Sequence, residues 1–163
     1  MADRIVALDP EADHARLMDL ALRAADYARL ESGREPDDGW VRETTRDAPP
    51  GVPPEDVLLF GLEREDGALS GWLGALRGFY APGEWYVGLL LLDPAARGQG
   101  EGARLFGHLR DMARADGARL LRIAVLEANP RARRFWEREG FTRLAKSVEG
   151  EDGHTRHVLE MDL

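Results

Sequence analysis

Hydrophobic residues recur along this chain with two periods, one typical of helices and one of strands. Helical spacing follows Asp9-Pro10-Glu11, where a cap residue, a proline and an acid predict a helix start, and it continues through residues 17–30. Residues 31–55 are rich in Gly, Pro and Asp instead. We therefore expect a functional loop or flap there, without regular helix or strand.

Extended apolar segments begin after this loop. Residues 57–62 and 71–76, on either side of a turn at Asp66-Gly67, predict a β-hairpin. Residues 85–92 are almost continuously apolar, which predicts a third strand that is buried on both faces. Residues 100–115 carry apolar side chains at helical spacing and predict the next helix.

The remaining third of the chain predicts a strand at 120–126, a short helix from Asn129-Pro130 to Gly140, and a terminal hairpin of residues 142–148 and 157–163. The predicted order is helix, three strands, helix, strand, helix and two strands. The central strand-helix-strand unit implies a parallel pair, which antiparallel strands flank on both sides. We therefore predict an α/β (α+β) fold with a mixed, mostly antiparallel sheet.

Length and composition indicate a single domain over residues 1–163, because 44% of the residues are hydrophobic and can form a core. The longest uncharged apolar stretch is far shorter than the ~20 residues of a membrane span, so we expect none. The first residues do not resemble a secretory signal, which predicts a cytoplasmic protein. The absence of cysteine excludes disulfides, thiolate metal sites and a cysteine nucleophile.

The formal net charge of −8 disfavours nucleic acid as a partner and suits a small cationic or amine-bearing substrate. Solubility explains the same charge equally well. Histidines and acids do not cluster at ligand spacing, so no metal site is predicted. Tryptophans and leucines in the predicted strands are compatible with a homodimer, but the sequence does not determine the oligomeric state.

The most informative motif is Arg97-Gly98-Gln99-Gly100-Glu101-Gly102, between a predicted strand and a predicted helix. The N–H groups at a helix start have no intrahelical partner and lie at the positive end of the helix dipole, so they can receive an anion. Glycines leave these groups uncovered. The glycines could simply form a turn, but three alternating glycines exceed that need. We therefore predict a cradle for a phosphorylated cofactor.

Together with the order of elements, two motifs in this chain resemble those of the GNAT superfamily of acyl-CoA-dependent N-acyltransferases. The family pattern of Arg or Gln, two residues, Gly, one residue and Gly or Ala is met by Arg97, Gly100 and Gly102, after Leu92-Asp93-Pro94. The second motif lies around the short helix near the C-terminus, where the matching residues are Asn129, Ala132, Phe135, Gly140 and Phe141.

The resemblance implies that acetyl-CoA is the co-substrate. The backbone of one strand would separate from the next strand and hold the pantetheine arm and the thioester, and the glycine loop would hold the pyrophosphate. Asn129 would contact the pantetheine arm, and Trp136 would flank it. The implied cofactor-binding residues are Leu90, Leu91, Leu92, Arg97, Gly98, Gln99, Gly100, Glu101, Gly102, Ala103, Asn129 and Trp136.

Transfer to an amine requires a proton acceptor and usually a general acid for the leaving thiolate. Glu84 is the nearest carboxylate on the strand that leads to the cofactor, and Tyr86 shares its face. We expect both to be catalytic, unless a bulge before Leu92 changes the facing. Glu84 could equally be a solvated turn residue. The family often has a tyrosine as general acid where this chain has Trp136, and an indole N–H cannot deliver a proton.

These features predict an N-acetyltransferase that moves an acetyl group from acetyl-CoA to a primary amine, by direct attack in a ternary complex. Trp136 and the lack of an unambiguous base leave one alternative open, a non-catalytic acyl-CoA binding or sensing module. A Rossmann-type nucleotide-binding domain fits less well. Its glycine loop follows the first strand of the fold, whereas here antiparallel strands come first.

Overall fold

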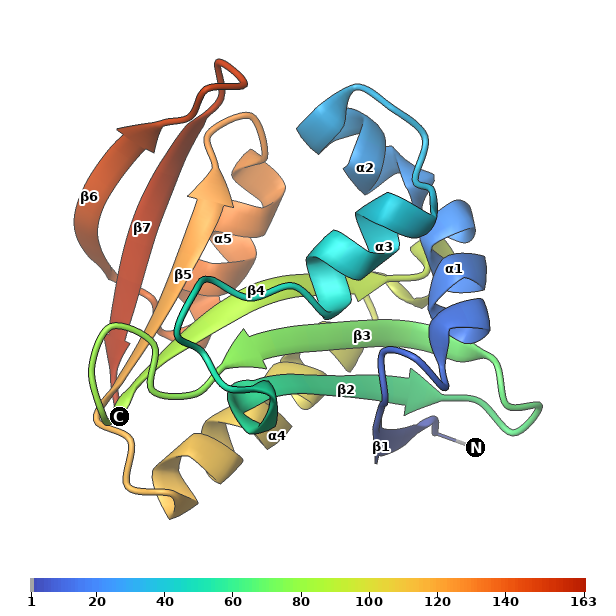
Figure 1. The fold of residues 1–163 in the computed structure, drawn as a ribbon, viewed down its shortest axis with the longest axis horizontal. Helices are drawn as coiled ribbons and strands as arrows, with labels where there is room; N and C mark the ends of the chain where they lie inside the picture. Colours follow the sequence, from blue (N-terminus) through green and yellow to red (C-terminus); the bar gives the residue numbers. More distant parts are fainter. Residues whose placement is uncertain (1) are drawn as a thin grey trace.

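A computed structural model, which describes residues 2–163, contains one seven-stranded sheet in the order β1-β2-β3-β4-β5-β7-β6 (Figure 1). Neighbouring strands are antiparallel except β4 and β5, which are parallel. The strands are β1 (Arg4–Ala7), β2 (Val57–Glu63), β3 (Leu69–Leu76), β4 (Glu84–Leu92), β5 (Leu120–Leu126), β6 (Arg143–Glu149) and β7 (Thr155–Asp162). The predicted mixed, mostly antiparallel sheet is confirmed.

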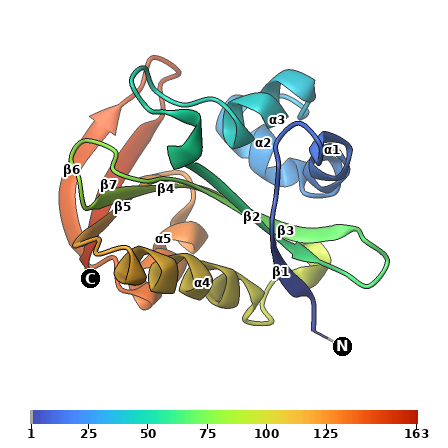
Figure 2. The same ribbon diagram turned by 60° about the horizontal axis from the view of Figure 1, so that its bottom comes forward.

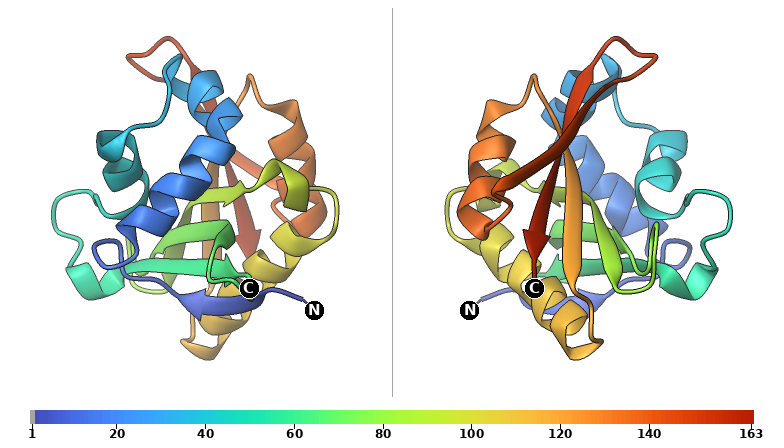
Figure 3. Two further views of the ribbon diagram at one scale, coloured as in Figure 1. Left: turned by 90° about the vertical axis from the view of Figure 1, so that its right-hand side faces the viewer. Right: turned by 90° about the vertical axis from the view of Figure 1, so that its left-hand side faces the viewer.

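Helices cover both faces of this sheet (Figure 2). One face carries α1, α2 and α3, and the other carries α4 and α5. The α-helices are α1 (His14–Arg23), α2 (Ala25–Ser32), α3 (Asp38–Thr45), α4 (Glu101–Ala115) and α5 (Pro130–Glu139), with short 3-10 turns η1 (Pro54–Asp56) and η2 (Pro94–Ala96). The β6–β7 hairpin forms one edge of the sheet, and its turn rises beside the end of α2 (Figure 3).

The predicted hairpins, the central strand-helix-strand unit and the short helix near the C-terminus are confirmed. Local chemistry explains their ends. Asn129 caps α5 by accepting a hydrogen bond of 3.1 Å from the N–H of Ala132, and Pro130 occupies the first helical position. Gly67 adopts a φ of +86° in the β2–β3 turn, a conformation that favours glycine.

Three features at the N-terminal end differ from the expectation. Strand β1 was not predicted, because only four residues pair with β2 and their sequence carries no clear alternation. Asp9 caps a turn instead of a helix, and α1 starts only at His14. The single predicted helix over residues 17–30 is two helices, because the backbone leaves helical geometry at Ala24 (ψ +32°). Neither proline nor glycine marks this break.

The expectation that residues 31–55 contain no regular helix is wrong for α3. Asp37 caps this helix by accepting a hydrogen bond of 2.8 Å from the N–H of Trp40. Trp40 and Val41 are buried against α1 and the sheet. This burial of apolar surface outweighs the weak helix propensity of the segment. The proline-rich residues 49–53 lie outside helices and strands, and η1 begins at Pro54.

Strand β4 contains a bulge that opens the sheet. Leu73 of β3 pairs with Leu90, but Ala75, two residues later, pairs with Val87, so β4 has one extra residue at Gly88 and Leu89. Pairing of β4 with β5 also stops at Val87. Beyond this point the two strands diverge (Figure 1), and Gly88 is exposed. The prediction that residues 85–92 are buried on both faces is therefore wrong beyond the bulge.

Candidate active site

The loop between β4 and α4 has the free N–H groups that an anion requires. Helix α4 begins at Glu101, and its first hydrogen bond runs from the N–H of Arg104 to the carbonyl of Gly100. In the described part of the chain, the N–H groups of residues 98–103 have no acceptor at normal hydrogen-bond geometry. These groups lie at the positive end of a 15-residue helix, which is a favourable place for a phosphate.

Glycine is required at three positions of this loop, for two different physical reasons. Gly98 (φ +75°) and Gly100 (φ +81°) adopt left-handed conformations, and a Cβ on either would point into open space. A Cβ on Gly102 would instead lie 3.4 Å from side-chain atoms of Leu90, Leu92 and Phe135. Gly102 thus allows α4 to approach the diverging end of β4, while the other two shape the loop.

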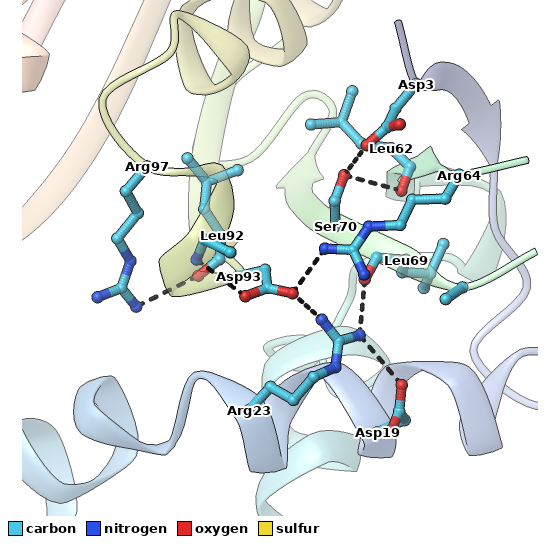
Figure 4. Close-up of polar contacts among 12 residues, drawn as sticks. Asp3, Asp19, Arg23, Leu62, Arg64, Leu69, Ser70, Leu92, Asp93 and Arg97 are labelled. Atoms are coloured by element: carbon cyan, nitrogen blue, oxygen red, sulfur yellow. Dashed lines mark hydrogen bonds and ion pairs between the residues drawn. The ribbon is translucent and has the colours of Figure 1, made fainter. Parts of the chain in front are cut away.

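A buried carboxylate holds the start of the loop in place (Figure 4). Asp93 is 6% exposed, and it accepts hydrogen bonds from the N–H of Ala95 (3.0 Å) and from Arg64 (2.7 Å). It also contacts the guanidinium of Arg23 on α1. Burial alone would raise the pKa of Asp93, but these hydrogen bonds and cations outweigh it and leave the pKa below its usual value.

Arg97 connects the loop to α2. Its guanidinium forms two hydrogen bonds to the carboxylate of Asp26 (2.6 and 2.9 Å) and a third to the carbonyl of Leu92 (3.2 Å). The hydrogen bonds from Arg97 lower the pKa of Asp26. The guanidinium of Arg97 is therefore engaged with α2 and with the end of β4, and it holds the loop entrance against both elements.

A cavity of about 560 Å³ is lined by the end of β4, the glycine loop, α2 and α5. This volume is typical of small-molecule sites. The lining includes the free N–H groups of the loop and the end of β4 that no longer pairs with β5, which together match an elongated ligand with an anionic group. The residues therefore fit coenzyme A, whose diphosphate would meet the loop while its pantetheine arm runs along β4.

Most of the predicted cofactor residues meet in this cavity. Those that line it are Leu90, Leu91, Leu92, Arg97, Gly98, Gly100, Gly102, Ala103, Asn129 and Trp136. Gln99 and Glu101 are not part of the lining. The Gln99 side chain donates to the carbonyl of Ala95, and Glu101 pairs with Arg104 at 2.9 Å. Only their backbone N–H groups remain free for the ligand.

Glu84 and Tyr86 lie outside the cavity lining. The carboxylate of Glu84 is paired with Arg119 (2.7 Å) and Arg122 (3.0 Å), and the hydrogen bond from Arg122 lowers its pKa. A carboxylate in such a network is a poor proton acceptor. Tyr86 packs against Phe79 with ring centroids 5.5 Å apart. The bulge separates both residues from the face of Leu92, so this geometry gives no support to the expected catalytic roles of Glu84 and Tyr86.

Trp136 occupies the α5 wall of the cavity. It is 5% exposed and packs edge-to-face against Phe106, with ring centroids 5.3 Å apart. Its indole Nε1 donates no hydrogen bond within residues 2–163, and it is not among the fully buried unpaired atoms. Trp136 thus lines the cavity with an indole N–H that is unpaired within the described chain, a donor that does not titrate.

Sequence reasoning missed the contribution of α2. Asp26, Tyr27 and Leu30 line the cavity from this helix, on the side opposite α5. In the sequence they belong to an amphipathic segment whose polar positions suggest a solvated face. The break at Ala24 sets the direction of α2 relative to α1, and no local sequence pattern predicts that break.

Within residues 2–163, no group of three or more His, Asp or Glu side chains is placed to hold a metal ion. In the same range, no helix has the length and apolar character that a membrane crossing requires.

The fold is similar to those of several solved acetyltransferases. An acetyltransferase from Thermus thermophilus is 24% identical (TM-score 0.74), with 100% of this chain and 98% of that chain covered. The ribosomal-protein-S18-alanine N-acetyltransferase from Escherichia coli is 19% identical (TM-score 0.73; 98% and 93% covered). Nourseothricin acetyltransferase is 22% identical (TM-score 0.70; 99% of both chains covered). At these identities the similarity shows the fold alone.

The family follows from a different comparison. A model of the acetyltransferase (GNAT) family matches residues 15–141, which include nearly all of α1, the bulged strand, the glycine loop and α5. This match covers both motifs up to Phe141 and most of the chain. The chain therefore belongs to the GNAT family and is an acetyl-CoA-dependent N-acetyltransferase.

Proposed function

We propose that this enzyme acetylates a primary amine of a small, cationic acceptor by direct attack in a ternary complex. The proposal depends on a second cavity of about 510 Å³, between α2 and the β6–β7 turn. Glu31 lines this cavity, and within residues 2–163 no Lys, Arg or His nitrogen lies within 4.0 Å of its carboxylate. An acceptor ammonium group is the natural partner of such a carboxylate.

The other charges of this cavity support an amine at the Glu31 end. Two of its arginines are already neutralised, Arg29 by Glu35 (2.5 Å) and Arg156 by Asp152 (2.9 Å). Arg34 lines the same cavity without a carboxylate partner in the described residues, so an anionic or polar group of the acceptor suits that end. The net charge of −8 favours the approach of a cation over longer distances.

Direct attack is supported by the arrangement of the two cavities. Leu30 lines both of them, so the two cavities adjoin at α2 and can hold the acyl donor and the acceptor at the same time. The chain has no cysteine that could carry the acetyl group in a covalent intermediate. Transfer in a ternary complex requires no such carrier.

The test is thiol release from acetyl-CoA with a panel of amines that includes lysine, spermidine, an alanine-initiated peptide and nourseothricin. We expect release above background with at least one cationic amine, and intersecting initial-velocity lines when both substrates are varied. Parallel lines would indicate a covalent intermediate and contradict direct attack. Intact acetyl-CoA binding with background release for every amine would instead support the acyl-CoA binding or sensing module.

A further inference from the structure

Tyr27 and Glu31, one turn apart on α2, form a hydrogen-bonded pair that connects the two cavities. Tyr27 lines the cofactor cavity with Leu90 and Leu91, whereas Glu31 lines the second cavity. The hydroxyl of Tyr27 donates to Oε2 of Glu31 at 2.9 Å. This hydrogen bond therefore crosses from the side of the acyl donor to the side that we propose for the acceptor.

Tyr27 is held firmly in this position. Its ring packs against the core under α1, α2 and α3, with its centroid 6.3 Å from that of Trp40. Burial raises the pKa of Tyr27 well above its usual value, and the charge of Glu31 raises it further. The guanidinium of Arg156 on β7, itself paired with Asp152, acts in the opposite direction. The hydroxyl therefore stays protonated at working pH.

The charged groups across the cavity belong to other elements. The loop contributes Arg97, which is paired with Asp26. Helix α5 contributes Arg131, Arg138 and Glu139. Cavity charges therefore come from both walls, but Glu31 is the carboxylate that hydrogen-bonds to Tyr27.

Tyr27 is the tyrosine that lines the cofactor cavity, since Tyr80 and Tyr86 lie outside its lining. The opposite wall carries Trp136, which can donate a hydrogen bond to the sulfur but cannot transfer a proton. On the basis of the proposed function, we propose that Tyr27 protonates the departing sulfur and that Glu31 returns a proton to Tyr27.

The step balances in atoms and electrons. The acceptor ammonium first releases one proton to solvent, and the neutral amine nitrogen then attacks the thioester carbon and forms the C–N bond. When the C–S bond breaks, its electron pair stays on sulfur. The nitrogen, cationic after attack, gives one proton to Glu31. Glu31 then donates to the oxygen of Tyr27, whose own proton passes to sulfur. One proton has moved from nitrogen to sulfur, and both side chains return to their starting states.

The relay also explains how a tyrosine of this kind can act as an acid. While Glu31 is charged, its carboxylate holds the proton of Tyr27 and opposes ionisation. A proton on Glu31 removes this charge and reverses the hydrogen bond. The Tyr27 hydroxyl is then free to turn toward the cavity, at the moment when the thiolate needs a proton.

The first part of the test uses acetyl-CoA and the amine of the panel that the wild-type enzyme acetylates fastest. We expect Tyr27→Phe to lower kcat about 100-fold, the usual contribution of a general acid, with the calorimetric Kd of acetyl-CoA unchanged. Glu31→Gln keeps an acceptor for the hydroxyl but cannot relay a proton. We expect a similar loss of kcat.

The second part separates this role from a structural one. Trp136→Tyr in the Tyr27→Phe background puts a hydroxyl on the opposite wall, and we expect it to restore kcat at least tenfold. Tyr80→Phe is the matched control, because it removes a tyrosine hydroxyl outside both cavities. We expect wild-type activity from it. Thermal unfolding shows whether each variant is folded. If Tyr27→Phe does not fold, the activity of Glu31→Gln alone tests the relay.

Two results would overturn the relay. One is a kcat within about threefold of wild type in Tyr27→Phe or Glu31→Gln. The other is a large loss in Tyr86→Phe while Tyr27→Phe retains activity. Neither result contradicts the proposed function, provided that the wild-type enzyme releases thiol from acetyl-CoA in the presence of an amine. Absence of release by the wild-type enzyme with every amine overturns the proposed function, and the relay with it.

Discussion

Gly100→Leu tests the glycine loop most directly, and Gly117→Leu is its matched control. Both glycines have nearly the same φ (+81° and +80°), and a Cβ on either meets open space. They lie at opposite ends of α4, and only Gly100 lines the cofactor cavity. The left-handed conformation costs a residue with a side chain about 1–2 kcal/mol, so both variants should lose a similar free energy of unfolding.

Only Gly100→Leu should weaken cofactor binding. A side chain at position 100 would cover N–H groups of the loop that have no acceptor in the described chain. Each hydrogen bond to a charged group contributes about 1.5–3 kcal/mol. Loss of two such bonds would therefore weaken binding by about 3 kcal/mol or more, which is more than about 100-fold in Kd.

Calorimetry measures the affinity of each variant for acetyl-CoA. Thermal unfolding measures the loss of stability that the left-handed backbone conformation causes in both variants. For a chain of this size, 1 kcal/mol shifts the Tm by about 2–4 °C. We expect matched Tm values for the two variants and a loss of affinity in one. Equal affinity in Gly100→Leu and the wild type would refute the phosphate cradle. An equal loss of affinity in both variants would show that binding depends on the stability of the protein and not on access to the N–H groups of the loop.

Three further predictions concern side chains around the loop. Asp93→Asn should lower the free energy of unfolding by about 3 kcal/mol at pH 7, because it breaks a buried ion pair. Since the folded pKa of Asp93 is below its usual value, its contribution is lost as pH falls, and chemical unfolding should show the difference shrinking below about pH 4. Asp26→Asn leaves the charge of Arg97 to an anionic ligand, so the Kd of acetyl-CoA should fall by about two- to fivefold, and a rise would contradict this. Asn129→Ala should cost about 1 kcal/mol of stability, whereas Asn129→Asp should keep the helix cap but bind acetyl-CoA more weakly by calorimetry.

The cofactor loop was predictable because its chemistry is local. A glycine with positive φ, a free N–H at a helix start and a cap residue each depend on a few neighbouring residues. Residues 97–103 and Asn129 were therefore identified from the sequence, and the structure brings them to one cavity except for the side chains of Gln99 and Glu101. The hairpins were predictable for the same reason, because their turns and alternation are short-range features.

The catalytic side chains were harder to predict because their positions depend on distant contacts. Alternation along β4 placed Glu84 and Tyr86 near the site, but the bulge at Gly88 and Leu89 changes which residues share a face. The pairing of Glu84 with Arg119 and Arg122 brings together residues about 35 positions apart. Sequence spacing carries no information about such a network.

The sequence alone determined the order of most elements, the glycine loop and the family resemblance, because each depends on short patterns that a single segment contains. Only the tertiary structure decided where β4 and β5 diverge, that α2 forms a wall of the cofactor cavity, and that Tyr27 and Glu31 lie between two cavities. These features arise from packing and ion pairs between distant segments. These contacts stabilise the protein only once the distant segments are packed together, so a pattern within one segment does not predict them.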